Sequence, residues 1–167
     1  VGGKITISDI KDLNIDDLLN REQVKPDTEL LNKNINFKNV LVTGAGGSIG
    51  GELCRQITKL KVNKLILLDL NEFALYKIHD ELITLNINLK IIPLLVNTQD
   101  QEKLEIIFES FKVDTVYHAA AYKHVPLVEE NICEGIKNNV FSTIAIANAS
   151  INKNVSNLVL ISSDKAV

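Results

Sequence analysis

The stretch Val40-Leu-Val-Thr-Gly-Ala-Gly-Gly-Ser-Ile-Gly50 joins an aliphatic run to a glycine-rich turn and to the start of a helical pattern. Gly44 permits a sharp turn from strand to helix, Gly47 lets the backbone approach a phosphate, and Gly50 lets the helix lie close to the strand. The start of the helix would offer free N–H groups and the positive end of its dipole to an anion. The stretch therefore predicts a binding turn for a dinucleotide pyrophosphate.

The next aliphatic run, at 64–68, ends in Asp69. This residue follows Gly50 at close to the ~20 residues expected for a carboxylate that holds the adenosine ribose. The simpler alternative is a strand-ending Asp that caps the following turn. The joint pattern of strand, turn, helix, strand and Asp favours dinucleotide binding. Because a 2′-phosphate beside Asp69 would be repelled, the sequence predicts NAD rather than NADP as the cofactor.

The composition is that of a soluble globular domain. The chain has 167 residues, enough for one domain with a core, and its net charge of −3 gives no basic surface for nucleic acid. No aliphatic run is long enough to span a bilayer. Cys54 and Cys133 lack the spacing of metal ligands, so we expect no metal site and two buried, reduced thiols.

From Val40 onward, short aliphatic runs alternate with helical patterns. This alternation predicts an α/β domain, a Rossmann-like doubly wound parallel sheet with right-handed crossovers. The runs are almost continuously apolar, as is typical of parallel strands buried on both faces. The five expected strands lie at 40–43, 64–68, 89–96, 115–118 and 158–162.

Three segments between these strands carry apolar residues at helical spacing, which predicts helices packed on the sheet. The expected packing faces are Leu75, Ile78, Leu82 and Leu85, then Leu104, Ile107, Phe108 and Phe111, then Ile132, Ile136, Val140 and Ile144.

Residues 1–39 are expected to form a leader that wraps the surface of the core, and residues 40–167 a cofactor-binding domain. Within the leader, Asn14-Ile-Asp-Asp-Leu-Leu-Asn20 is typical of a short helix with an Asn N-cap and acids in its first turn. The chain begins without Met and stops just past an apolar run, where natural domains rarely end. The sequence therefore predicts a fragment of a longer protein, truncated before the rest of its active site.

Ligands of open parallel sheets bind at the carboxyl ends of the strands. The fourth expected strand ends in His118-Ala-Ala-Ala-Tyr-Lys-His-Val-Pro126, whose alanines would leave room for a flat nicotinamide. Close helix–sheet packing explains them equally well. Lys123 could contact a phosphate or a sugar, or it could be a solvated charge on a loop. For His124 we expect the solvated charge. The candidate cofactor-binding residues are Gly44, Gly47, Ser48, Ile49, Gly50, Asp69, Asn97, Thr98, Ala119, Ala120, Ala121 and Lys123.

The fifth expected strand ends in Ser162-Ser-Asp-Lys165. An Asp–Lys pair at the end of a buried strand is poorly explained by packing, because burial of either charge alone costs several kcal/mol. Next to a cofactor the two groups could act as acid and base. The alternative is a surface ion pair on a loop.

Taken together, these motifs and Asn138-Asn-Val140 resemble the extended short-chain dehydrogenase/reductase superfamily. More narrowly, they resemble the CapD-like polysaccharide biosynthesis proteins, the long, membrane-anchored branch of bacterial nucleotide-sugar 4,6-dehydratases. The segment His118–Pro126 is far more specific than the glycine motif. The resemblance implies an NAD(P)-dependent conversion of UDP-N-acetylglucosamine to a UDP-4-keto-6-deoxy sugar for surface polysaccharide or glycan biosynthesis.

The resemblance also assigns roles to individual residues. In that family the cofactor oxidises the sugar C4 hydroxyl, water leaves across C5–C6, and the hydride returns to C6. Lys165 would be the base at C5, Asp164 the acid that protonates the departing C6 hydroxyl, and Ser163 a hydrogen-bond partner near the C4 oxygen. The resemblance further implies a homo-oligomer at the cytoplasmic face of the bacterial inner membrane, whereas the fragment itself would be soluble.

The sequence departs from the family pattern in two places. Val96-Asn97 replaces the usual Gly-Asp after the third strand, which predicts weaker contacts with the adenine. The Tyr-x-x-x-Lys or Met-x-x-x-Lys motif would lie beyond Val167, so the fragment alone is expected to be inactive. Two other functions fit the same residues. The first is a nucleotide-sugar 4-epimerase, which needs no Asp–Lys pair, and the second is a non-catalytic nucleotide-binding module.

Overall fold

A computed structural model describes residues 26–85 and 88–162. In chain order the elements are α2 (Thr28–Ile35), β1 (Asn39–Thr43), α3 (Ser48–Thr58), β2 (Lys64–Asp69), α4 (Glu72–Leu85), β3 (Lys90–Leu95), α5 (Gln101–Phe111), β4 (Thr115–His118), α6 (Val125–Glu130), α7 (Ile132–Ile136), the π-helical turn η2 (Lys137–Phe141), α8 (Ser142–Asn152) and β5 (Asn157–Leu160). Each of the five expected strands is present, and its ends differ from the expected ones by at most two residues.

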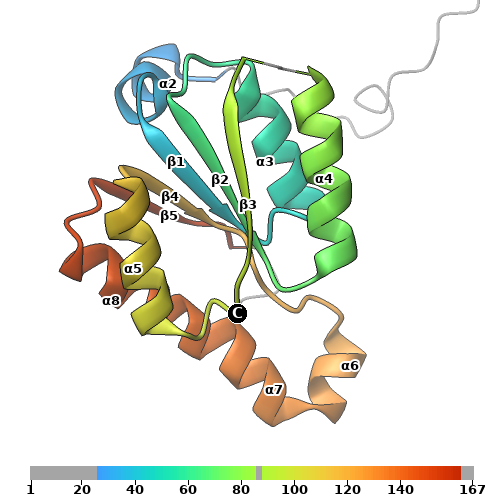
Figure 1. The fold of residues 1–167 in the computed structure, drawn as a ribbon. Helices are drawn as coiled ribbons and strands as arrows, with labels where there is room; N and C mark the ends of the chain where they lie inside the picture. The colour runs from blue at the N-terminus through green and yellow to red at the C-terminus, as the bar shows by residue number, and fades with distance from the viewer. Residues whose placement is uncertain (1–25, 86–87, 163–167) are drawn as a thin grey trace, which may run out of the picture.

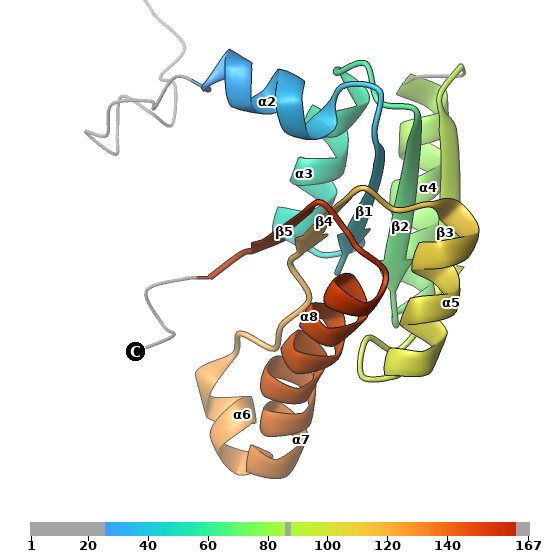
Figure 2. The same cartoon turned by 90° about the vertical axis from the view of Figure 1, so that its left-hand side faces the viewer.

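The five strands form one parallel sheet in the order β3-β2-β1-β4-β5. The chain starts in the middle strand, moves to one edge, and then returns to build the other half. Figures 1 and 2 show α3 and α4 on one face of this sheet and α5 and α8 on the other. The predicted Rossmann-like doubly wound fold is thereby confirmed.

Alternate residues of the central strands supply two separate cores. Val40 and Val42 of β1 pack with α3 and α4, whereas Leu41 packs with α5 and α8. In β2, Leu65 and Leu67 face the first core. Both cores follow from the two-residue period of a strand, since successive side chains point to opposite faces of the sheet.

The expectation that every strand is buried on both faces is wrong for the two edge strands. β1 is buried throughout, but Leu95 of β3 is 51% exposed and Leu160 of β5 is 54% exposed. Within the described residues, β3 pairs only with β2 and β5 only with β4. An edge strand has a neighbour on one side alone, and this leaves its side chains less covered.

The helical faces are confirmed in part. Leu75, Ile78 and Leu82 are buried against the sheet, but Leu85 is 62% exposed because it is the last residue of α4. In α5, Leu104, Ile107 and Phe108 are buried as expected, and Phe111 is partly buried at the edge of the same core.

The third expected face is wrong. Ile132, Ile136, Val140 and Ile144 are all exposed, by 45–61%. The buried residues of α8 are instead mostly small, and they are Ser142, Ala145, Ile146, Ala149 and Ser150. Small side chains let α8 approach the sheet and α5 closely, so the regularly spaced large residues occupy the opposite face.

The helix α2 lies at the amino ends of the strands, away from the predicted ligand edge (Figure 2). Asp27 caps it by accepting the N–H groups of Glu29 and Leu30. Its last residue, Ile35, is buried in the core with α3 and α4. The helix expected at 14–20 lies outside the described residues.

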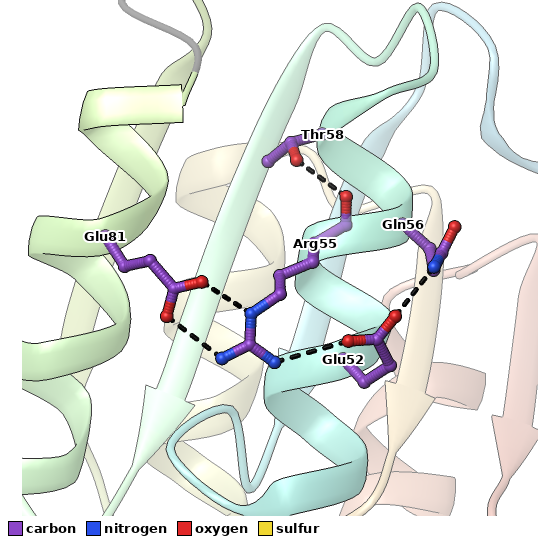
Figure 3. A network of polar contacts seen from close by, with 5 residues as sticks. All are labelled: Glu52, Arg55, Gln56, Thr58 and Glu81. Carbon is purple, nitrogen blue, oxygen red and sulfur yellow. Dashed lines mark hydrogen bonds and ion pairs between the residues drawn. The ribbon is translucent and has the colours of Figure 1, made fainter. Parts of the chain in front are cut away.

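A polar network ties α3 to α4 on one face of the sheet (Figure 3). Arg55 donates from Nε and Nη2 to the two carboxylate oxygens of Glu81, at 2.5 and 2.9 Å, and from Nη1 to Glu52 at 3.3 Å. These bonds lower the pKa of Glu81 and raise that of Arg55. Because Arg55 is half-buried and both carboxylates are exposed, water screens these charges, and each ion pair contributes little to stability.

No helix within residues 26–85 and 88–162 is long and apolar enough to cross a membrane.

Candidate functional site

The glycine turn after β1 is shaped by close backbone contacts. Gly44 has φ +63°, and a Cβ there would lie 2.8 Å from the backbone of Ala120. A Cβ at Gly50 would lie only 2.1 Å from the Gly44 carbonyl oxygen. Positive φ and these approaches exclude larger side chains at both positions, in agreement with the roles predicted for them.

The helix α3 begins directly after this turn with an open N-terminus. Its N-cap residue is Gly47, which has no side chain to accept the first N–H groups. Ser48 and Ile49 follow, and both are exposed. The N–H groups of the first turn, with the positive end of the helix dipole, are therefore available to an anionic ligand.

Asp69 at the end of β2 contacts two backbone segments. Its Oδ1 accepts the N–H of Asn71 at 2.9 Å, which is the turn-capping role considered as the simpler alternative. Its Oδ2 accepts the N–H of Gly46 at 2.8 Å, which joins the carboxylate to the glycine turn. Asp69 thus organises the turn and also lines the cavity beside it.

Two cavities open at the carboxyl edge of the sheet. The first, of about 550 Å³, is the Asp69 cavity, and its polar lining includes Asp69, Asn97 and Thr98. The second, of about 520 Å³, is the Lys123 cavity, which lies over the start of α3 and is bounded by α6 and α7. Both are lined by Gly47 and by residues of the Ala119–Tyr122 segment, which forms a shared wall.

All twelve residues that the sequence proposed for the cofactor line one of these cavities or both. The Asp69 cavity is lined by Gly44, Gly47, Asp69, Asn97, Thr98, Ala119, Ala120 and Ala121. The Lys123 cavity is lined by Gly47, Ser48, Ile49, Gly50, Ala119, Ala121 and Lys123. The fold brings these residues together, and their contact with a cofactor stays a prediction.

The shared wall is held by residues that belong to the motifs quoted above but to which the sequence assigned no role in the site. The Asn139 side chain accepts the N–H of Tyr122 at 2.8 Å and donates to its carbonyl at 3.0 Å. Asn139 lies in η2, and its neighbour Asn138 lines the Asp69 cavity. Two adjacent Asn residues inside an apolar helical pattern were the sequence signal for this site.

His118, at the end of β4, is also part of this support. Its side chain is 2% exposed and lies between Thr43 of β1 and Thr143 of α8. Burial lowers the pKa of His118 to about 4, so the imidazole is neutral at physiological pH.

Ser163, Asp164 and Lys165 lie outside the described residues. β5 ends at Leu160, and Ile161 donates its N–H to the His118 carbonyl at 3.0 Å. The last described residues therefore lie at the carboxyl edge of the sheet, where the two cavities open.

The cysteines differ from each other. Cys54 is buried, as predicted, and its burial raises the pKa of the thiol to about 12. Cys133 is exposed, which corrects the expectation that both thiols are buried, because α7 turns this side chain away from the core. Among the described residues no group of His, Cys, Asp and Glu could hold a metal ion.

Comparison with known proteins agrees with this geometry. Residues 40–167 match the family described as "Polysaccharide biosynthesis protein". The chain belongs to this family, a CapD-like branch of the extended short-chain dehydrogenases/reductases. A capsular polysaccharide biosynthesis protein, CapD, of Staphylococcus aureus is 40% identical over 100% of the chain. The chain spans only 28% of the length of that relative.

Other relatives of the chain are named as enzymes that act on nucleotide sugars. An inverting UDP-N-acetylglucosamine 4,6-dehydratase of Campylobacter jejuni is 32% identical over 78% of the chain and 38% of the relative. A UDP-glucose 4-epimerase of Rickettsia prowazekii is also 32% identical, again over 78% of the chain and 38% of the relative.

Solved structures share the fold. The X-ray structure of Pen from Bacillus thuringiensis has a TM-score of 0.73 at 28% identity, over 80% of the chain and 41% of that structure. A UDP-glucose-4-epimerase of Stenotrophomonas maltophila, crystallised with NAD and formylated UDP-arabinopyranose, has a TM-score of 0.67 at 22% identity, over 77% and 38%. NAD is thus bound by a structural neighbour with this fold.

Proposed function

We propose that the chain is the NAD-binding part of a UDP-sugar 4,6-dehydratase that makes a UDP-4-keto-6-deoxy sugar for polysaccharide or glycan biosynthesis. The observation that carries the proposal is the pair of cavities at the carboxyl edge, which meet at Gly47 and the Ala119–Tyr122 wall. A dinucleotide has two halves joined at a pyrophosphate, and the pair of cavities meets at a helix N-terminus suited to that group.

In this proposal each half of the cofactor occupies one cavity. The adenosine lies in the Asp69 cavity, where Asp69 holds the ribose hydroxyls and Asn97 and Thr98 flank the adenine. The pyrophosphate lies at Gly47 and Ser48. The nicotinamide half extends along Ala119 and Ala121 into the Lys123 cavity, towards the sugar.

The lining of the Asp69 cavity supports NAD over NADP. It contains one carboxylate and, among the described residues that line it, no Lys or Arg. A 2′-phosphate next to Asp69 would meet like charge without a compensating cation, which disfavours NADP.

In the proposed reaction three residues after β5 act at C5, C6 and the C4 oxygen, and the proton of the C4 hydroxyl goes to a base in the part of the active site that we place beyond Val167. When bound, NAD accepts a hydride in the oxidation of the sugar at C4 and supplies it again at C6. Lys165 takes the C5 proton, which the C4 ketone acidifies, and Asp164 protonates the C6 hydroxyl as it leaves as water. Ser163 donates a hydrogen bond at the C4 oxygen. Positioned groups of this kind contribute ~10²–10⁴-fold per proton transfer.

The test is a product analysis with the complete protein, UDP-N-acetylglucosamine and NAD. We expect a product lighter by one water in mass spectrometry, abolished by Asp164→Asn and by Lys165→Ala and weakened by Ser163→Ala. Full activity of the Asp164 and Lys165 variants would refute the assigned roles. Turnover by residues 1–167 alone would contradict the proposal that further sequence completes the active site.

A 4-epimerase is the second candidate, because two relatives carry that name. It would leave the mass of the sugar nucleotide unchanged and invert C4, which NMR of the sugar ring detects. NAD binding without any change in UDP-sugars would instead indicate a non-catalytic module. We also propose that the complete protein is a membrane-anchored homo-oligomer with its catalytic part in the cytoplasm, with residues 1–39 as the leader of that part.

A further inference from the structure

A chain of hydrogen bonds runs from the end of β1 through His118 into η2. Thr43 Oγ1 lies 2.7 Å from His118 Nδ1, and Thr143 Oγ1 lies 3.1 Å from His118 Nε2. Thr143 Oγ1 in turn donates to the Asn139 carbonyl at 2.7 Å. The order of protons along this chain follows from the donors and acceptors that each group possesses.

At the Thr143 end, the partners show which group donates the hydrogen bond between His118 and Thr143. The hydroxyl of Thr143 has one proton, and the Asn139 carbonyl, which can only accept, takes it. The oxygen of Thr143 must therefore accept from His118, so Nε2 carries a proton.

The partners of Thr43 independently indicate the same tautomer of His118. Thr43 Oγ1 accepts the N–H of Ala120 at 3.3 Å and that of Ala119 at 3.2 Å, the latter shared with the Thr43 carbonyl. Two N–H groups occupy its lone pairs, so its own proton points to His118 Nδ1. Nδ1 accepts, and the imidazole is neutral and protonated at Nε2. The depressed pKa of His118 agrees with this state.

We propose that His118 is a positioning residue for cofactor binding: in its Nε2-protonated form it links the glycine turn of β1 to η2 and thereby fixes the Ala119–Tyr122 wall. The inference rests on the proposed binding of NAD in the two cavities. None of Thr43, His118 and Thr143 lines either cavity, so their effect on the cofactor is transmitted through the wall.

The wall is attached at both of its ends to the same π-helical turn. Its first two residues donate to Thr43, which His118 and Thr143 connect to the Asn139 carbonyl. Its last residue, Tyr122, is paired with the Asn139 side chain. A change that breaks the chain at His118 disconnects Thr43, and with it the first end of the wall, from η2, while Tyr122 stays paired with Asn139.

The imidazole suits this position because it presents an acceptor and a donor on opposite sides of one rigid, uncharged ring. An apolar ring would leave the Thr43 proton and the Thr143 oxygen buried without partners. Protonation of Nδ1 would direct a third donor at Thr43 Oγ1, which already accepts the N–H groups of Ala119 and Ala120, so one of these two bonds would be lost.

The first experiment reads the tautomer directly. Long-range ¹H–¹⁵N spectra of ¹⁵N-histidine-labelled protein distinguish the two neutral tautomers and the imidazolium, and a His118→Gln variant assigns the signal. We expect the Nε2-protonated pattern at neutral pH. A signal from the Nδ1-protonated tautomer or from the imidazolium would overturn the inference.

The second experiment measures NAD affinity in variants that break the chain away from the cavities. Thr143→Val preserves the shape of the side chain but removes the hydroxyl, and we expect it to weaken NAD binding about three- to tenfold. Thr143→Ser restores the hydroxyl and should recover the affinity. The control is Ser150→Ala, because the Ser150 hydroxyl of α8 is buried and, like that of Thr143, donates to the carbonyl four residues before it.

The outcomes separate this inference from the proposed function. Unchanged NAD affinity in Thr143→Val, or an equal loss in Ser150→Ala, would overturn the positioning role while NAD binding itself stands. An unaltered protein that binds no NAD would overturn both. NAD binding without dehydration of a UDP-sugar would refute the proposed reaction and leave the role of His118 intact.

Discussion

Asp69 accepts the N–H of Gly46 through its Oδ2 atom at 2.8 Å. The carboxylate at the end of β2 therefore fixes the turn that follows β1, and its other oxygen holds the N–H of Asn71. A single side chain combines the structural role of a turn cap with a position beside the cavity proposed for the adenosine.

We expect Asp69→Asn to weaken NAD binding about tenfold and to reduce the preference for NAD over NADP. The amide removes the negative charge and replaces one acceptor oxygen by a donor, so one of the two N–H groups loses its partner. Titrations of both nucleotides against the two proteins measure this. Tighter binding of NADP than of NAD by the unaltered protein would refute the cofactor assignment.

Asp100→Asn is the matched control for this change. Asp100 caps α5 by accepting the N–H of Lys103, and it lines neither cavity. Asn is an equally good N-cap, so both the stability and the affinity for NAD should be retained.

The adjacent glycines of α3 should respond in opposite ways to Ala. A Cβ at Gly50 would lie 2.1 Å from the Gly44 carbonyl oxygen, so Gly50→Ala should cost about 1–3 kcal/mol of stability and impair NAD binding. At Gly51 the nearest atoms lie at 3.4–3.8 Å, and Ala should be neutral or stabilising by up to about 1 kcal/mol. Thermal unfolding and NAD titration measure both. Equal effects at the two positions would show that the turn can move away from α3.

The two thiols should differ in their reactivity towards iodoacetamide. Cys133 is exposed, whereas Cys54 is buried and its pKa is raised to about 12. At pH 8 only on the order of 10⁻⁴ of Cys54 is thiolate, the reactive form, and the reagent cannot reach it. Peptide mass spectrometry of the native protein should find the label on Cys133 alone, and labelling in guanidinium should find both. Rapid native labelling of Cys54 would mean that α3 opens readily.

The central strands and the glycine turn were predictable because local sequence determines them. β1 and β2 are continuous aliphatic runs, and a turn with the backbone contacts of Gly44 and Gly50 admits no other residue. The side of the helical segment from α7 through α8 that packs on the sheet was not predictable in the same way. Regular spacing shows that Ile132 and Ile136 share a face with later residues, but it does not show which face meets the sheet.

The support of the candidate site was hidden for a different reason. His118 and its partner Thr43 are 75 residues apart, and Thr143 is a further 25 residues along the chain. The parallel pairing of β1 with β4 brings Thr43 to His118, and the packing of α8 brings Thr143 to the other side of the ring. The cavity-lining residues were found because they follow strand ends, which the topology places at a common edge.

The buried imidazole of His118 should make the fold sensitive to acid. Its pKa is about 4 in the folded protein and about 6.5 when unfolded, so between these values the unfolded chain binds the additional proton. Stability then rises with pH, and about 3 kcal/mol should be lost as the pH falls from about 6.5 to about 4.

Urea unfolding across this range measures the loss. A His118→Gln variant should be less stable at neutral pH but should lack this part of the acid-side slope, whereas His79→Gln, which leaves His118 in place, should retain it. An identical slope in the His118 variant would show that other groups cause the acid sensitivity.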